Sequence, residues 1–398
     1  MNRSLTEVES LLPATLIRRL ALDPPAELLP TDEAFDATVL FLDISGFVDL
    51  SNRLSAQGAV GAETLSTILN TFFEHVIDTV YAFEGDVVKL AGDGMIAVWD
   101  ARAFAKGSAV LNAAWCAFRI QDQCAELSLP ELEKLLTKIG LANGQIHMLC
   151  VGGAQDRWEL IPSGPSLIEA CEAEQRARPG EIVASPGFWE EVKAGIQGER
   201  LPNKYYRLKR SGDANAASVP IPDKLPPTAA NHLKSFLPRS VLSRLDRGIL
   251  NWIGELRRVT VLFVYPGKRF NPRALALDEI QKLTVDLQKL VYHFGGNINK
   301  WTVDEKGAGL IVGFGLPPKA HEDDPARAVT AALEIGRLMS ETGIEGGIGL
   351  ATGTIYCGLV GCSRRREYTV IGPAVNRAAR LAFAAKELIL CDEATRYA

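Results

Sequence analysis

Two aspartates stand where carboxylates could bind a metal ion. Asp43 ends the apolar run TVLFLDISGF, and Asp93 lies in the AGDG turn of GDVVKLAGDGMIAVW. If the first strand neighbours that hairpin, both carboxylates converge at one edge of the sheet. Neighbouring carboxylates repel each other unless a cation neutralises them, and hard oxygen ligands suit Mg²⁺ or Mn²⁺. Each aspartate alone could be an ordinary turn residue, but the two together predict a metal site.

A second pair of polar residues lies late in the chain. In NRAARLAF, Asn376 and Arg380 are four residues apart, so a helix would place them on one face. An amide that can hold a ribose, beside a guanidinium that can hold phosphate charge, suits a nucleotide. The alternative interpretation, an Asn and an Arg on the solvent face of an amphipathic helix, stays open on these residues alone.

An internal repeat organises the elements that must carry these residues. The matching pairs, in the same order in both halves, are TVLFLDISGF (38–47) with TVLFVYPGKR (260–269), VYAFEGDVVKLAGDGMIAVWD (80–100) with VYHFGGNINKWTVDEKGAGLIVGFG (291–315), and KIGLANGQIHMLCVGG (138–153) with GIGLATGTIYCGLVGC (347–362). The shared order and near-constant spacing predict two homologous domains. The match pairs Lys89 with Lys300 and Asp93 with Asp304.

Each half shows the same predicted order of elements. Apolar residues recur at helical spacing over 60–83 and again over 278–294. The order strand, long helix, hairpin, helix, strand predicts an α+β fold. Between the halves, the stretch 209–231 is rich in Pro, Gly, Ser and Ala, which is typical of a linker. The segment LKSFLPRSVLSRLDRG that follows predicts a short helical lead-in.

Composition limits the classes of function. The 398-residue chain has a net charge of −5 and no basic stripe, so nucleic acid is not an expected partner. The seven cysteines form no CxxC pair, which favours reduced thiols over a disulfide framework or a zinc site. The sequence shows no signal segment and no apolar run near the roughly 18 residues of a membrane span. We therefore expect no integral membrane segment and a cytoplasmic location.

Several motifs resemble those of class III nucleotidyl cyclases: FLDISGF, KLAGDGMIAVW and REYTVIGPAVNRAAR at 366–380. The tandem arrangement, with INKW and EYTVIG in the second half, is most similar to the catalytic part of the bicarbonate-responsive soluble adenylyl cyclases. The resemblance implies two ferredoxin-like cyclase domains paired head-to-tail as a pseudo-twofold heterodimer in one chain. The expected parts are an N-terminal segment (1–34), a first cyclase domain (35–208), a linker with a helical lead-in (209–255) and a second cyclase domain, expected to be C-terminally incomplete (256–398).

The resemblance also implies a role for each matching residue. Asp43 and Asp93 would hold two Mg²⁺ or Mn²⁺ ions. Lys300 and Thr369 would read adenine, the ammonium donating to a ring nitrogen and the hydroxyl accepting from the exocyclic amine. The other implied substrate contacts are Asn376 with the ribose, Arg380 with the α-phosphate, Lys138 with the triphosphate, and Ile44 beside the first acid.

Two basic positions have a plainer interpretation. Lys138 could be a solvated lysine at the end of a strand. The segment SRRRE at 363–367 is interpreted as a solvated hairpin tip in preference to a phosphate clamp.

Of the two clefts that a head-to-tail pair creates, only one has a complete set of residues. In the other, Tyr265 aligns with Asp43, so one acid is missing. Matching Gly164 to Gly372 gives the counterparts of Thr369, Asn376 and Arg380 as Ile161, Ile168 and Glu172. A glutamate in place of the arginine would repel a triphosphate. We therefore expect this degenerate cleft to be regulatory or merely structural.

In the relatives that the chain most resembles, the degenerate cleft holds bicarbonate between a lysine and an arginine. Lys89 matches the lysine, but Cys171 stands at the position of the arginine, with Glu172 next to it. A thiol supplies no fixed positive charge, and small anions of this shape bind well to a guanidinium. The sequence therefore predicts weak or absent stimulation by bicarbonate.

The expected function is that of an adenylyl cyclase, which converts ATP to 3′,5′-cyclic AMP and pyrophosphate by two-metal-ion catalysis at one interdomain site. A guanylyl cyclase is the first alternative. Lys300 and Thr369 argue against it, because guanylyl cyclases tend to carry an acid and a Cys or Ser there. The second alternative is a nucleotide-binding regulatory module with little turnover. Its main support is that the sequence stops at LILCDEATRYA, soon after the last motif.

Overall fold

The structure is a computed structural model. It describes residues 7–127, 129, 135–210, 227–245, 254–267 and 275–398.

The first half of the chain forms one sheet with helices around it. Its elements are α2 (Ala14–Leu22), β1 (Thr31–Ile44), α3 (Phe47–Ser55), α4 (Ala59–Ala82), β2 (Asp86–Ala91), β3 (Gly94–Asp100), α5 (Ser108–Glu126), β4 (Thr137–Gly152), β5 (Trp158–Ser163), α6 (Pro165–Arg176), β6 (Ile182–Ala184), α7 (Pro186–Val192), β7 (Gln197–Arg200) and β8 (Tyr206–Lys209). The strand order is β2-β3-β1-β4-β6-β8-β7, and β5 pairs with β4.

The second half forms a second sheet of the same design. Its elements are α8 (Pro227–Ser235), α9 (Arg239–Leu245), β9 (Glu255–Tyr265), α10 (Leu277–His293), β10 (Asn297–Asp304), β11 (Gly307–Phe314), α11 (Asp324–Glu341), β12 (Gly347–Gly361), β13 (Arg366–Ile371), α12 (Pro373–Ala385), β14 (Ile389–Cys391) and α13 (Glu393–Arg396). The strand order is β10-β11-β9-β12-β13, and β14 pairs with β12. In both sheets the first long strand lies between its hairpin and the next long strand. The mixed α+β fold with two sheets is therefore confirmed.

The two hairpins share an irregularity that the repeat does not reveal by itself. In β2–β3 the register shifts by one residue between Val87 and Lys89. In β10–β11 it shifts in the same way between Ile298 and Lys300. An extra residue in one strand re-aims the side chains that follow it. The bulges therefore give Lys89 and Lys300 equivalent positions in their two hairpins.

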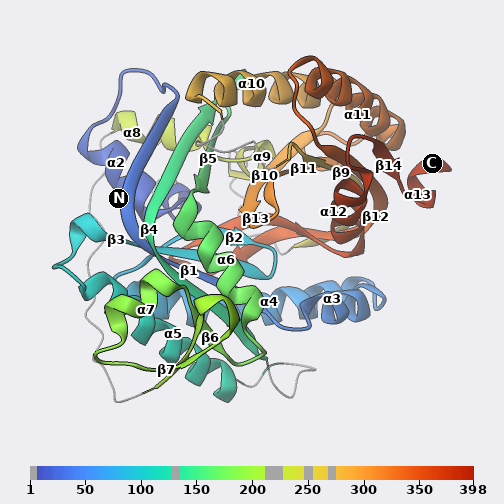
Figure 1. The fold of residues 1–398 in the computed structure, drawn as a ribbon. Coiled ribbons are helices and arrows are strands. Elements are labelled where there is room, and N and C mark those ends of the chain that lie inside the picture. The colour runs from blue at the N-terminus through green and yellow to red at the C-terminus, as the bar shows by residue number, and fades with distance from the viewer. Residues whose placement is uncertain (1–6, 128, 130–134, 211–226, 246–253, 268–274) are drawn as a thin grey trace.

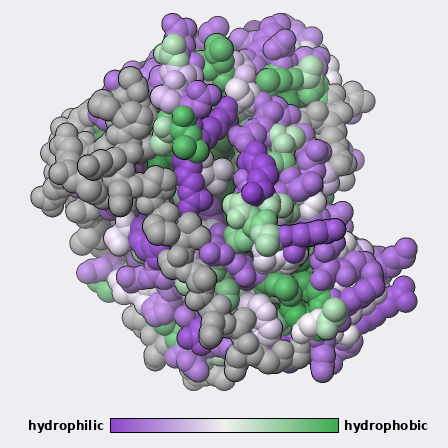
Figure 2. Space-filling model, turned by 90° about the vertical axis from the view of Figure 1, so that its left-hand side faces the viewer, coloured by the Kyte–Doolittle hydropathy of each residue, from purple (hydrophilic) through white to green (hydrophobic). Residues whose placement is uncertain are grey.

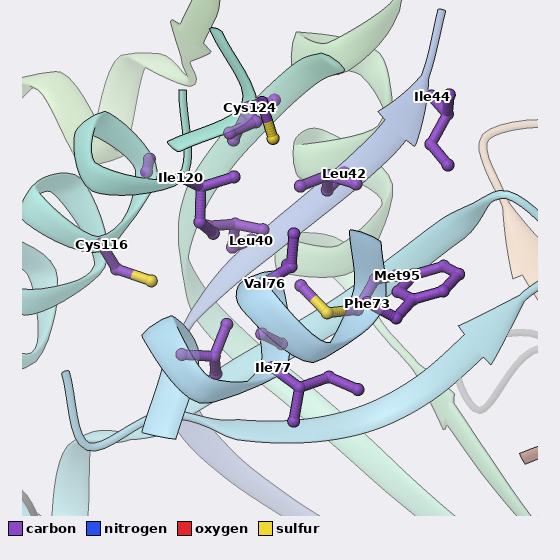
Figure 3. Close-up of a cluster of buried hydrophobic side chains, with 14 of the residues drawn as sticks. Leu40, Leu42, Ile44, Phe73, Val76, Ile77, Met95, Cys116, Ile120 and Cys124 are labelled. Carbon is purple, nitrogen blue, oxygen red and sulfur yellow. The ribbon is translucent and has the colours of Figure 1, made fainter. Parts of the chain in front are cut away.

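The core of the first half lies between its sheet and the helices α4 and α5. Apolar residues of α4 recur every three or four positions, so they form one buried face. Figure 3 shows Val76 of this helix beside Leu40 and Leu42 of β1, with Phe73 and Ile77 in the same cluster. This packing fixes the strand whose last two residues are Asp43 and Ile44.

The halves pack on each other reciprocally. Helix α4 of the first half lies against β12 of the second, and α10 of the second lies against β4 of the first (Figure 1). The hydroxyls of Ser66 and Tyr356 are 3.1 Å apart across the first contact. Across the second, the Gln281 side chain accepts from the Gly152 N–H at 2.8 Å and donates to its carbonyl at 2.7 Å. Each half therefore contributes one long helix to the sheet of the other.

Helices outside the two repeats pack against the second sheet. Buried apolar residues of α2, α8 and α9 form one cluster with residues of the second sheet. The short helical lead-in is thus observed where the structure describes it, as α8 and α9. Of the predicted linker 209–231, residues 211–226 lie outside the described part. Strand β1 begins at Thr31, before the expected boundary at residue 35.

The surface offers little apolar area on the face shown in Figure 2, where hydrophilic residues predominate and the hydrophobic ones are scattered among the coloured atoms. In the described ranges, none of the helices combines the length and the apolar character needed to cross a membrane.

Candidate functional site

The two aspartates of the first half lie together. Strand β1 pairs with β3 so that Asp43 is opposite Gly94, the residue after Asp93. The β2–β3 turn therefore carries Asp93 to the end of β1. Both carboxylates border the same cleft.

Their charges are not balanced within the protein. Burial and the nearby Glu174 carboxylate raise the pKa of Asp43 to about 6, although Lys138 opposes the shift. Burial and the repulsion from Asp43 raise the pKa of Asp93 to about 8. A pair of crowded carboxylates short of positive charge fits a hard divalent cation. Within the described ranges no group of three or more His, Cys, Asp or Glu residues could hold a metal ion.

Lys138 lies beside the first acid. It is the β4 partner of Asp43 in the sheet, and its ammonium is 4.0 Å from the Asp43 carboxylate. It also forms an ion pair with Glu174 of α6, a residue that the sequence reading did not single out. A Cβ on Gly140 would lie 2.0 Å from the Ala170 carbonyl oxygen. This glycine therefore lets α6 pack closely enough on β4 for the ion pair to form.

A glycine allows an equally close approach between β12 and α12, the helix that carries Asn376. A Cβ on Gly349 of β12 would lie 2.0 Å from the Ala378 carbonyl oxygen of α12. Asn376 is half-buried and borders the same cleft as the two aspartates. Arg380, one turn further along α12, is exposed and does not line the cleft.

The two residues expected to read the base are in direct contact. Lys300 is only 2% exposed. Its ammonium donates to the Thr369 hydroxyl at 3.0 Å and to the Leu90 carbonyl of the first half at 2.7 Å. Burial lowers the pKa of Lys300 to about 8, although Glu367 opposes the shift.

A buried carboxylate lies next to this pair. Glu367 is 3.4 Å from the ammonium of Lys89, 3.6 Å from that of Lys300 and 2.9 Å from the guanidinium of Arg365. Burial by itself would raise the pKa of Glu367, but these three cations hold it well below its usual range. Glu367 is the first residue of EYTVIG, but the motif assigns it no role, because its partners come from both halves of the fold.

The interpretation of SRRRE as a solvated hairpin tip is wrong for Arg365. Its side chain is 2% exposed. It donates to the carbonyls of Val87 at 3.0 Å and Leu11 at 3.2 Å, in addition to its ion pair with Glu367. A local run of arginines cannot reveal such partners, because they are distant in the sequence.

Most of the predicted site residues line one cleft of about 290 Å³, to which both halves of the chain contribute. Those that line it are Asp43, Asp93, Lys300, Thr369 and Asn376, together with Lys89 and apolar side chains such as Phe47, Trp301 and Phe383. Ile44 is 3% exposed and packs in the first-half core at the end of β1 (Figure 3). Ile44 and Lys138, like Arg380, do not line the cleft.

The residues expected in the degenerate cleft differ in type and burial from their counterparts in the other cleft. Leu149 pairs with Ile161 in β4–β5 as Gly358 pairs with Thr369 in β12–β13, so an isoleucine occupies the position of the threonine. Cys171 is 1% exposed and packs in an apolar cluster.

Arg176, the last residue of α6, is engaged by neighbours in the first half. It is 3.7 Å from the Glu172 carboxylate and stacks on the Tyr205 ring. Lys89 is paired with Glu367.

Comparison with known proteins agrees with this geometry. Residues 30–198 match the family model of the adenylate and guanylate cyclase catalytic domain. These residues are a class III nucleotidyl cyclase domain. The chain is also 28% identical to adenylate cyclase type 10 of Oryctolagus cuniculus and 27% identical to that of Homo sapiens; each match covers 92% of this chain and 25% of the relative. The chain thus spans about a quarter of the length of these curated relatives.

A solved structure supports the fold over nearly the whole chain. A class III adenylyl cyclase-like ATP-binding protein from Pseudomonas aeruginosa matches with a TM-score of 0.62 and 14% identity, covering 96% of this chain and 91% of that one. At this identity the likeness concerns the fold alone. The class III cyclase fold is therefore supported beyond residue 198.

Proposed function

We propose that the chain is an adenylyl cyclase that converts ATP to 3′,5′-cyclic AMP and pyrophosphate at the interdomain cleft. One observation carries the proposal: two acids of the first half and a Lys–Thr pair of the second line the same cleft. A metal-assisted reaction on a nucleotide needs both groups, one at the phosphates and one at the base. The similarity to curated adenylate cyclases over 92% of the chain supports this choice.

The hydrogen bonds of Lys300 and Thr369 favour adenine. Two of the three ammonium N–H groups of Lys300 are donated to Leu90 and Thr369, which leaves one for a ring nitrogen. The Thr369 oxygen keeps a lone pair that can accept from the exocyclic amine. Guanine presents an N–H at the same ring position, so the ammonium would face another donor.

The acid pair would bind the metal ions. Divalent ions held by Asp43 and Asp93 would lower the pKa of the ribose 3′-hydroxyl and neutralise phosphate charge. Asn376 is suited to orient the ribose, and Lys138 to hold Asp43 in place through the 4.0 Å contact. Two ions, as Mg²⁺ or Mn²⁺, and the intramolecular pairing of the halves are part of the proposal.

The test is the identity of the product. The purified chain, incubated with ATP or with GTP in Mg²⁺ or in Mn²⁺, is expected to yield cyclic AMP from ATP and much less cyclic GMP. Mass spectrometry distinguishes the two products. Preferential formation of cyclic GMP would favour the guanylyl cyclase alternative.

Arg380 bears on a second candidate function, a nucleotide-binding module with little turnover. Its exposed position outside the cleft favours this candidate. If the chain is a cyclase, α12 must bring Arg380 to the α-phosphate as the transition state forms. Arg380→Ala is then expected to lower kcat on the order of 10²-fold with little change in KM, because the contact forms only in the transition state. An unchanged kcat would remove Arg380 from the mechanism.

We also predict weak or absent stimulation by bicarbonate. Lys89 is already paired with Glu367, Cys171 is buried, and Arg176 is engaged by Glu172. A cyclase assay at constant pH, in which bicarbonate is titrated against chloride, should show less than about twofold activation. Saturable several-fold activation that is lost in Lys89→Ala would contradict the prediction.

A further inference from the structure

The carboxylate of Glu367 and the ammonium of Lys300 both form hydrogen bonds with the backbone of Leu90. The Leu90 N–H donates to Glu367 at 3.1 Å, and the Leu90 carbonyl accepts from Lys300 at 2.7 Å. Leu90 belongs to the hairpin whose turn carries Asp93. Glu367 also lies two residues before Thr369 on β13, so both side chains point to the same face of the strand. Glu367 thus links the metal-bearing hairpin of one half to the base-reading pair of the other.

The charges around Glu367 also influence the protonation state of Lys300. Lys300 shares its buried surroundings with two other cations, Lys89 and Arg365, and Glu367 is the carboxylate that contacts all three. The side chains of this group are only 2–14% exposed, so solvent screens their repulsion weakly. Without Glu367, the neutral amine of Lys300 would be favoured. A neutral amine can accept from the ring N–H of guanine, whereas an ammonium cannot.

We propose that Glu367 is a positioning residue that holds Lys300 as an ammonium against Leu90 and Thr369, and so keeps the cleft selective for adenine over guanine. The inference rests on the proposed nucleotide function of the cleft. It assigns to Glu367 an effect on specificity that reaches the base through Lys300.

Glu367→Gln tests the proposal, because it keeps the size of the side chain and an oxygen that can accept from Leu90. Burial and the two neighbouring cations already depress the pKa of Lys300 to about 8. Loss of the carboxylate should lower it further, so the alkaline limb of kcat/KM for ATP should move down by about one pH unit. The ratio of kcat/KM for ATP to that for GTP should fall about 10-fold near pH 8. Glu367→Asp, which retracts the charge by one methylene, should give intermediate values.

Glu159→Gln is the matched control. Glu159 is more buried than Glu367, with a side chain 4% exposed against 14%, and is paired with a different cation, Arg157, at 3.1 Å. Its replacement should lower thermal stability without moving the alkaline limb or the ATP-to-GTP ratio. A Glu367→Gln protein that loses only stability, and keeps the wild-type limb and ratio, would overturn the proposal.

Two further outcomes keep the test decisive. If Glu367→Gln does not fold, an unchanged ratio in Glu367→Asp counts against the inference. If the wild-type chain makes no cyclic nucleotide, the proposed function fails, and the same variants are compared by equilibrium binding of ATP and GTP. The binding ratio should still fall in Glu367→Gln, and an unchanged ratio there would reject the positioning role.

Discussion

Replacement of Asp43 or Asp93 by asparagine is expected to lower cyclase turnover on the order of 10³-fold. Metal ions stabilise transition-state charge by several kcal/mol, and each variant removes one of the two carboxylates that would hold them. The fold should survive. The raised pKa of Asp93, about 8, means that its ionisation costs stability as the pH rises from about 4 to 8. The melting temperature of the Asp93→Asn variant, at pH 8 and without metal, should therefore be no lower than that of the wild type.

Asp304→Asn is the matched control for these variants. Asp304 is the counterpart of Asp93 in the second hairpin and borders the same cleft, but its carboxylate accepts from the N–H groups of Lys306 and Gly307. An asparagine can accept the same bonds, so turnover should stay near that of the wild type. Initial rates in Mn²⁺ and melting curves provide the comparison. Near wild-type turnover in Asp43→Asn or Asp93→Asn would rule out the acid pair as metal ligands.

Exchange of Lys300 for Glu and of Thr369 for Cys should erode the preference for ATP. Both groups are buried, at 2% exposure, and in the proposed site they would face the base edge with a fixed pattern of donors and acceptors. A buried polar group without a partner costs about 1–3 kcal/mol, so each change should lower kcat/KM for ATP about 10- to 100-fold. The double variant should at the same time gain relative activity on GTP, because the new carboxylate can accept from the ring N–H of guanine.

The single variants separate the two contributions. Lys300→Glu should cost more than Thr369→Cys, because it places two carboxylates, the new one and Glu367, within a few ångströms. Rates with both nucleotides, measured at saturating Mg²⁺, provide the ratio. An ATP-to-GTP ratio that stays at the wild-type value in the double variant would show that these residues do not read the base.

Much of the scaffold follows from local pattern. The long helices at 60–83 and 278–294 and the hairpin turn at Asp93 are observed within a residue or two, because apolar periodicity and turn chemistry act over short distances. The repeat also indicated that Lys89 and Lys300 are equivalent, and the shared bulge gives the structural reason.

The residues that the sequence did not reveal act through distant partners. Glu367 contacts Lys89 and Leu90 of the other half. Glu174 of α6 forms an ion pair with Lys138 of β4. Arg365 sits in a basic run that is typical of a solvated turn, yet it is buried by tertiary packing. Periodicity predicts which elements form. It does not predict which charged side chains of two different sheets will meet.

In the proposed function, one nucleotide site is built from both halves of the chain. Equilibrium titration with 3′-deoxy-ATP and Mn²⁺ tests it most directly, because this analogue lacks the attacking hydroxyl and cannot react. We predict one nucleotide bound per chain. We also predict that Asp93→Asn, in the first half, and Lys300→Glu, in the second, each weaken that binding at least tenfold. Binding of two nucleotides per chain, or binding that either variant leaves unchanged, would contradict the claim.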